Sequence, residues 1–329
     1  MRLRQSDAPL RLFKTALNAL VFAALATLGP AEAAEWPAKP VTIVHMFAAG
    51  GNGDFAARII AKALTDKFGQ SFTVDNRTGG GGTIGTVSVA RAVPDGYTLL
   101  LTATGPAVLN ELLFKAVPYD TERDFTPIIL VGDTPQVIVG SPKFGFKTLQ
   151  DLVAFGQKNP GKLNIGHPGT GSMGHLTAAL FLARTGIQGT LIGYRGGALV
   201  VMDVLSGQIH AGTPAYNSSA KNATVLALTS DKRVSFLPEV PTAREAGVDL
   251  VASTWQALMG PAGLPPEIVA KLNTAINAFL SSAEGMQQFA TAGIRPLGGT
   301  AEHLAETIKS DRALWAPIIA KENIKLNPD

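Results

Sequence analysis

Apolar and polar positions along the chain alternate between two patterns. Short apolar runs, typical of buried strands, are followed by glycine-containing turns and then by stretches with apolar residues three or four positions apart, as in amphipathic helices. The clearest unit has an apolar strand from Val41 to Phe47, a turn from Ala48 to Asp54, and a helix that continues to Leu64. This alternation predicts an α/β fold.

The turn after the first strand is a candidate anion site. Gly50, Gly51 and Gly53 permit positive φ angles and let a ligand approach the backbone. A helix that begins here would direct free N–H groups and its positive dipole end into the turn. Asp54 is expected to cap this helix, or to contact the ligand directly.

The strand–turn–helix pattern recurs, and each glycine turn follows the carboxyl end of a predicted strand. We therefore expect doubly wound α/β lobes with mainly parallel sheets and a ligand at the carboxyl ends of the strands. Thr148 is expected to cap the helix from 148 to 159, and Ser172 to cap the helix that includes His175. The other glycine turns lie at 78–85, 104–106, 167–174 and 195–197.

The first 34 residues have the features of a secretory signal peptide. Basic residues precede an apolar run from Ala16 to Leu28, Gly29 and Pro30 break the run, and small residues follow for cleavage. An uncleaved anchor is the alternative, although the apolar run is short for a membrane span. We expect export to the periplasm, and no later segment that spans a membrane.

Composition narrows the possible functions. Removal of residues 1–34 lowers the formal net charge from +3 to +1 and leaves 295 residues, enough for two α/β domains. No run of Lys and Arg suggests nucleic acid as a partner. The sequence contains no cysteine, which excludes disulfides, zinc–thiolate sites and cysteine nucleophiles.

Two segments resemble parts of enzyme motifs. The segment from Gly51 to Ala56 fits G-x-G-x-x-A, and Asp75 ends the next strand, as in a dinucleotide-binding oxidoreductase. The segment from Thr170 to Gly174 lacks the first glycine of a G-x-S-x-G elbow. The histidines show no metal-binding spacing. We expect no catalytic residue, metal or cofactor.

Some side chains at strand ends are candidates for ligand contact. His167 opens a glycine turn and could contact a ligand or bond its own backbone. Arg77 and Arg195 could each pair with a carboxylate, or remain solvated. Tyr194 could form a wall of the cleft or part of the core.

The order and spacing of several segments resemble the periplasmic solute-binding proteins of tripartite tricarboxylate transporters, the Bug family. The resemblance covers residues 36–325. The segments that carry it are WPAKPVTIV, FAAGGNGD, VDNRTGGGGTIGT, ARAVPDGYTLLLT, VPYDTERDFTPI, GKLNIGHPGTGSMGHL, YRGGALVVMDVLSGQI, FLPEVPTAREAG and GPAGLPPEIVAKLN.

The resemblance implies two α/β lobes joined by crossover strands, the Venus-flytrap arrangement. Lobe 1 would comprise residues 35–138 and 257–329, and lobe 2 residues 139–256. The protein would be a monomer and not an enzyme, and would deliver a small carboxylate, often a dicarboxylate, to a two-subunit membrane permease. Presentation of the ligand to a membrane receptor, as a sensor component, is the alternative.

The resemblance also implies which residues hold the carboxylate. The first turn would bind one carboxylate, the turn of the second lobe would face it, and two threonines would border the cleft. Together with the candidates above, the expected ligand-binding residues are Phe47, Ala49, Gly50, Gly51, Asp54, Thr102, Thr104, His167, Gly169, Gly171, Ser172 and Tyr194.

The chain departs from the family pattern near the pocket. Met46, Gly53 and His167 replace a proline, a threonine and a small residue, and the segment after Ile209 lacks the usual Asp-Asn pair. Without that acid, an amino-acid ligand is not expected. We also hypothesise that His167, if charged below about pH 6.5, binds a second acidic group and makes dicarboxylate binding tighter at pH 6 than at pH 8.

Overall fold

The computed structural model describes residues 35–47, 49–194, 196–216, 220 and 223–321. The expected signal peptide lies outside these residues. Residues 1–38 and 39–329 are separate units, and the strands and helices of the described residues all lie in the second unit. No helix among the described residues is long and apolar enough to cross a membrane.

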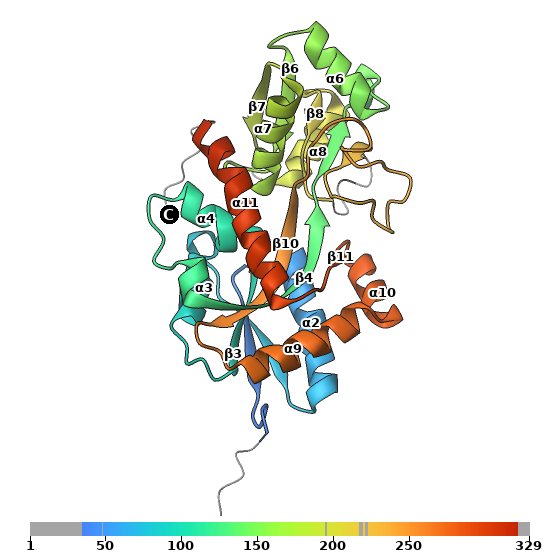
Figure 1. Cartoon of the computed structure of the whole chain (residues 1–329). Coiled ribbons are helices and arrows are strands. Elements are labelled where there is room, and N and C mark those ends of the chain that lie inside the picture. The colour runs from blue at the N-terminus through green and yellow to red at the C-terminus, as the bar shows by residue number, and fades with distance from the viewer. Residues whose placement is uncertain (1–34, 48, 195, 217–219, 221–222, 322–329) are drawn as a thin grey trace, which may run out of the picture. The chain divides into compact units, whose positions relative to one another are not determined.

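Two sheets organise the chain into two α/β lobes (Figure 1). The first has six strands in the order β11-β4-β10-β3-β1-β2, and the second has five in the order β7-β6-β8-β5-β9. The first comprises β1 (Val41–His45), β2 (Phe72–Asn76), β3 (Thr98–Ala103), β4 (Phe125–Pro135), β10 (Ser253–Pro261) and β11 (Arg295–Pro296). The second comprises β5 (Val137–Gly140), β6 (Leu163–His167), β7 (Gly189–Gly193), β8 (Ala211–Gly212) and β9 (Thr224–Leu228).

The expectation of mainly parallel sheets is wrong, because both sheets are mixed. Strand β1 pairs in parallel with β2 and β3, and β6 with β7 and β8. Strand β10 is antiparallel to β3 and β4, and β5 is antiparallel to β8 and β9. The reason is the connection between the sheets: the chain leaves the first sheet through β4 and returns through β10, so these two strands must run in opposite directions.

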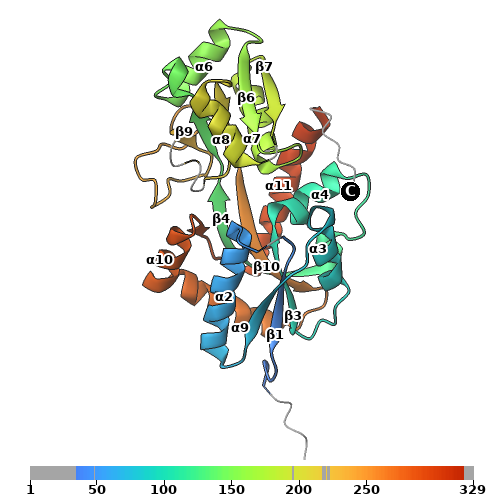
Figure 2. The same ribbon diagram turned by 180° about the vertical axis from the view of Figure 1, so that it is seen from behind.

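Helices cover both faces of the first sheet (Figures 1 and 2). On one face lie α2 (Asn52–Phe68), α9 (Pro266–Leu280) and α10 (Ala283–Thr291), and on the other lie α3 (Thr83–Ala90), α4 (Asn110–Leu113) and α11 (Ala301–Lys321). The short α5 (Thr121–Asp124) precedes β4. Helix α11 contacts β4 of the first lobe and α7 of the second. It therefore packs against both lobes.

The second sheet carries α6 (Leu149–Lys158), α7 (Met173–Thr185) and α8 (Gly197–Ser206). Residues of α6 and α7 pack in one core cluster with β6, whereas α8 packs in another with β5. Thr148 caps α6 in a reciprocal capping box with Asp151, as the sequence predicted. The proposed domain boundaries at residues 138 and 256 stay a prediction.

Candidate ligand-binding site

The glycine turn after β1 leads directly into α2. Gly50 has φ +89°, Gly51 is the N-cap with extended backbone, and the helix begins at Asn52. A Cβ atom at Gly53 would lie 2.6 Å from Cε1 of His45. A glycine is therefore required at position 53, because the His45 ring lies directly beneath it.

The expectation that Asp54 caps α2 is wrong. Because the helix begins at Asn52, Asp54 lies in its first turn and reaches back to the loop. Its carboxylate accepts hydrogen bonds from Gly50 N, Arg58 Nε and Asn76 Nδ2, each at 3.0 Å. Burial alone would raise the Asp54 pKa, but these donors outweigh burial and lower it. The charged carboxylate thus holds the turn in place.

His45 supports the same turn from the sheet. Its side chain is buried, Nδ1 lies 3.3 Å from the Leu101 carbonyl oxygen, and its ring meets Phe47 edge to face at 5.8 Å. Burial lowers the His45 pKa, so the ring is neutral near pH 7. His45 is therefore a buried, neutral residue that supports the turn from beneath.

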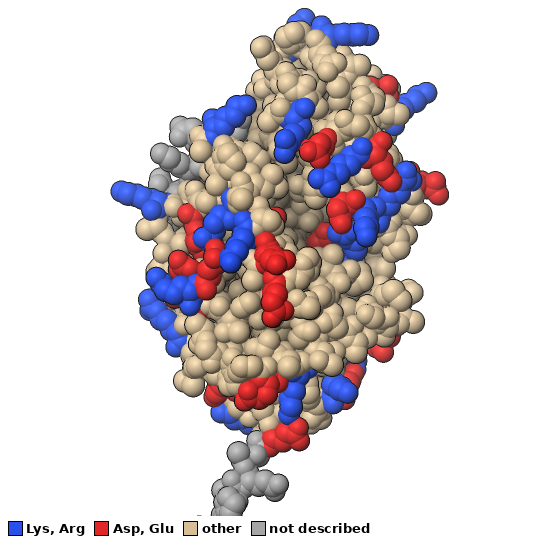
Figure 3. Space-filling model, in the orientation of Figure 1, with Lys and Arg blue, Asp and Glu red and all other residues tan. Residues whose placement is uncertain are grey.

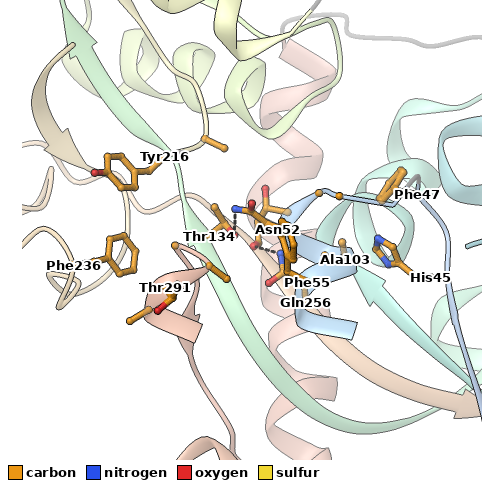
Figure 4. Close-up of a pocket in the computed structure, with 18 residues that line it drawn as sticks. His45, Phe47, Asn52, Phe55, Ala103, Thr134, Tyr216, Phe236, Gln256 and Thr291 are labelled. Carbon is orange, nitrogen blue, oxygen red and sulfur yellow. Dashed lines mark hydrogen bonds between the residues drawn. The ribbon is translucent and has the colours of Figure 1, made fainter. Parts of the chain in front are cut away.

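A cavity of about 700 Å³ opens in front of this turn (Figure 4). This volume is in the usual range for small-molecule sites. We call it the interlobe cavity, because residues of both lobes line it. They are His45, Phe47, Gly50, Gly51, Asn52, Gly53, Phe55, Ala103, Thr134, Thr254, Gln256 and residues 290–293 of the first lobe, and Ala215, Tyr216 and Phe236 of the second.

Three of the predicted site residues, Phe47, Gly50 and Gly51, line the interlobe cavity. Phe55, Gln256 and Phe236 also line the cavity and were not predicted from the sequence. The side chain of Phe55 is 47% exposed and lies at the cavity. Its position one residue after Asp54, in the first turn of the helix, was the available signal.

The predicted residues of the second lobe form a compact group. Ser172 caps α7 by accepting a hydrogen bond from His175 N at 3.1 Å, as expected, and donates to the Gly169 carbonyl at 2.7 Å. Gly171 N donates to His175 Nδ1, and Tyr194 N donates to the His167 carbonyl. These residues are not among those that line the interlobe cavity. Their contact with a ligand stays a prediction.

The two predicted threonines are buried within the first lobe. The Thr104 hydroxyl accepts a hydrogen bond from Trp255 N at 3.0 Å and so joins the end of β3 to β10. Thr102 is also buried. Neither lines the interlobe cavity, and neither does the exposed Ala49. Their ligand contacts also remain predictions.

Of the two candidate arginines, the structure describes one. Arg77 Nε donates to Asp75 at 2.8 Å, and its Nη1 donates to Ser88. Asp75, the acid of the dinucleotide interpretation, therefore already has a partner. Arg195 lies outside the described residues.

In the space-filling view, positive and negative side chains are interspersed over the face shown (Figure 3).

His167 and His175 stack with ring centroids 4.0 Å apart. Burial lowers the pKa of His167, so the hypothesis that it becomes charged near pH 6.5 must be corrected: any charge appears at lower pH. The tighter binding of dicarboxylates at pH 6 than at pH 8 stays a prediction. Burial and the neighbouring His167 also lower the pKa of His175 to about 4.

The His175 pKa predicts a loss of stability in acid. The unfolded chain binds a proton below about pH 6.5, whereas the folded chain resists it until about pH 4. Between pH 7 and pH 5 this group should therefore remove about 2 kcal/mol from the free energy of unfolding. Urea unfolding at both pH values measures it. His175→Gln should show a shallower pH dependence; equal slopes in the two proteins would contradict the prediction.

Comparison with known proteins places this architecture in a family. The model of the tripartite tricarboxylate transporter family receptor matches residues 56–324. Protein BugT of Bordetella pertussis is 35% identical over 322 residues, which cover 95% of this chain and 99% of BugT. The chain therefore belongs to the tripartite tricarboxylate transporter receptor family. This is a family of periplasmic solute-binding receptors and not of enzymes, and the resemblance inferred from the sequence is confirmed.

Solved structures agree on the two-lobed fold. Rpa4515 of R. palustris, determined with adipate, superposes with a TM-score of 0.74 at 33% identity and covers 88% of this chain and 99% of its own. MatC of Rhodopseudomonas palustris, determined with bound malate, gives 0.68 at 27% identity, with coverages of 86% and 100%. Both ligands are carboxylates.

Proposed function

We propose that this protein captures a small organic carboxylate between its two lobes in the periplasm and delivers it to a two-subunit membrane permease. The observation that carries the proposal is the glycine turn at the start of α2, which lines a cavity shared with the second lobe. The first amides of a helix have no partner within the helix, and together with the helix dipole they favour an anion.

Capture of the anion requires little rearrangement in the first lobe. Asp54 already holds Gly50 in position, and Gly51 presents open space where a side chain would lie. Phe47, Gly50 and Gly51 are the residues we place at the carboxylate. The turn from Gly169 to Ser172 would meet the ligand from the second lobe as the lobes close. The adipate and malate of the two relatives support an acid of this size.

Export is the remaining part of the proposal. The family is periplasmic, and the basic and apolar pattern of residues 1–34 would direct the chain there before cleavage. The exported protein would act as a monomer that passes its ligand to the permease. A deletion strain should lose uptake of the ligand and regain it when the gene is restored.

A thermal-shift screen tests the binding step. The protein purified from the periplasm is mixed with mono-, di- and tricarboxylates, aromatic acids and amino acids. A true ligand at a hundredfold its dissociation constant should raise the free energy of unfolding by about 2.7 kcal/mol. NAD is the control and should have no effect. Absence of a shift with every acid would contradict the proposed function.

A further inference from the structure

Aromatic side chains form walls of the interlobe cavity on both sides. Phe47 and Phe55 come from the first lobe and are 41% and 47% exposed. Tyr216 and Phe236 come from the second lobe and stack on each other, with centroids 5.7 Å apart and planes 18° apart (Figure 4). Aromatic surface that faces a cavity is stabilised when an apolar group covers it. The walls therefore favour a ligand with an apolar or aromatic body.

One buried side-chain oxygen at the same cavity has no hydrogen-bond partner among the residues that the structure describes. Gln256 lies on β10, is 3% exposed and lines the cavity. Its Nε2 donates to the Thr254 carbonyl oxygen at 3.3 Å. Because a carbonyl oxygen can only accept, the amide nitrogen must face Thr254, and Oε1 is left without a partner among the described residues.

An unpaired buried oxygen is unfavourable and is seldom left so in folded proteins. Two other amide nitrogens near the cavity already have partners. Asn52 Nδ2 donates to Thr134 Oγ1, and Gln136 Nε2 donates to Thr254 Oγ1, each at 3.3 Å. Gln256 Oε1 is therefore the acceptor that a ligand's N–H or O–H group would satisfy.

The charge of the residues that line the cavity is a third constraint on the ligand. The described residues that line the cavity include no Lys, Arg, Asp or Glu, and His45 is neutral near pH 7. The one feature suited to an anion among these lining residues is the start of α2. A second carboxylate at the Gln256 end would face an oxygen instead of a cation, whereas a neutral donor would be satisfied there.

We infer that the interlobe cavity binds a carboxylate whose apolar or aromatic body carries a hydroxyl or N–H donor, with the carboxylate at the glycine turn and the donor on Gln256 Oε1. This inference rests on the proposed function and narrows its ligand class. It assigns Gln256 as the residue that selects for the donor, and Phe55 as a wall that selects for the body.

Matched acids with and without a hydroxyl group test the role of Gln256. The probes are 3-(4-hydroxyphenyl)propionate against 3-phenylpropionate, 4-hydroxybenzoate against benzoate, and 6-hydroxyhexanoate against hexanoate, measured by calorimetry with the protein purified from the periplasm. In at least one pair the hydroxyl should tighten binding by about tenfold, because it satisfies a buried acceptor. This comparison needs no mutation.

Substitutions then assign the effect to a residue. Gln256→Met keeps the size of the side chain and should abolish the preference for the hydroxyl. Gln136→Met is the matched control: Gln136 is equally buried beside Thr254 but is not among the lining residues, so the preference should remain. Phe55→Ala should weaken both members of a pair about tenfold. Phe144→Ala, which replaces an exposed phenylalanine outside the cavity, should not weaken the binding of either acid.

The outcomes separate this inference from the proposed function. If no pair shows a hydroxyl preference, or if Gln256→Met retains the preference, the inference is wrong. Tighter binding of adipate than of every hydroxy acid would also overturn it, while the proposed function would stand. If no carboxylate binds at all, the proposed function itself fails.

Discussion

Replacement of Arg295 by methionine should lower the free energy of unfolding by about 3–5 kcal/mol. Arg295 lies on β11 and donates two hydrogen bonds of 2.9 Å to the carboxylate of Asp133, whose side chain is 3% exposed. Removal of the guanidinium leaves that carboxylate buried without a counter-charge. Urea unfolding at pH 7 measures the loss.

The same arginine links the two lobes. Its Nη1 lies 2.5 Å from a carboxylate oxygen of Asp231, which follows β9 of the second sheet, whereas Asp133 is on β4 of the first. Both carboxylates raise the Arg295 pKa despite its burial, so the charge persists. The variant therefore loses a link between the lobes as well as the partner of Asp133.

Two further variants test this explanation. Addition of Asp133→Asn to Arg295→Met should restore part of the lost stability, because no buried charge is left unpaired. Arg244→Met, which breaks an exposed pair with Asp249, should change stability by less than about 1 kcal/mol. Equal losses from Arg244→Met and Arg295→Met would show that burial of Asp133 does not explain the effect.

Replacement of Asp54 by alanine is the second large effect we expect. The variant loses the acceptor of Gly50 N, Arg58 Nε and Asn76 Nδ2, and hydrogen bonds to a charged group are the stronger kind. Arg58 is half exposed, so its share is reduced by solvent. We expect a loss of about 3 kcal/mol in the free energy of unfolding.

The Asp54 variant should also bind carboxylates at least about tenfold more weakly, since the glycine turn loses its hydrogen bond to Asp54 and must be ordered when the ligand binds. Asp66→Asn is the control, because Asp66 pairs with Lys62 on the exposed face of the same helix. It should change neither stability nor affinity appreciably. Unchanged affinity in Asp54→Ala would contradict the positioning role.

The lowered pKa of Asp54 also makes the free energy of unfolding depend on pH. Since the folded pKa is lowered, the stabilisation by this carboxylate is present above the ordinary value near 4 and is lost as the pH falls through the folded pKa. Asp54→Ala should therefore be less sensitive to acid than the wild type below pH 4. The loss of stability due to His175 occurs at higher pH, between about 6.5 and 4, so the effects of His175 and Asp54 on unfolding can be separated.

Local sequence patterns were sufficient for the elements that depend on neighbouring residues. The strand before the glycine turn, the cap of α7 by Ser172 and the capping box of Thr148 involve residues within a few positions of one another. Their propensities and hydrogen bonds are therefore visible in the sequence. The order of the longer segments was sufficient to identify the family.

Other features depend on contacts between residues distant in the sequence. The chain's return through β10 made the first sheet mixed, and no periodicity distinguishes a buried parallel strand from a buried antiparallel one. Because α2 starts at Asn52, Asp54 does not cap the helix; it accepts a hydrogen bond from Gly50 N instead. The position of Phe55 at the cavity likewise depends on how the two lobes pack.

By itself, the sequence determined the α/β alternation, the glycine turn before a helix, and membership of a carboxylate-binding receptor family, because these depend on local spacing and on the order of motifs. Only the tertiary structure decided how Arg295 joins Asp133 and Asp231, and that Gln256 Oε1, at a cavity between the lobes, has no partner in the described part of the chain. The physical reason is that charge pairing and burial are set by which distant side chains meet, and the sheet register decides that.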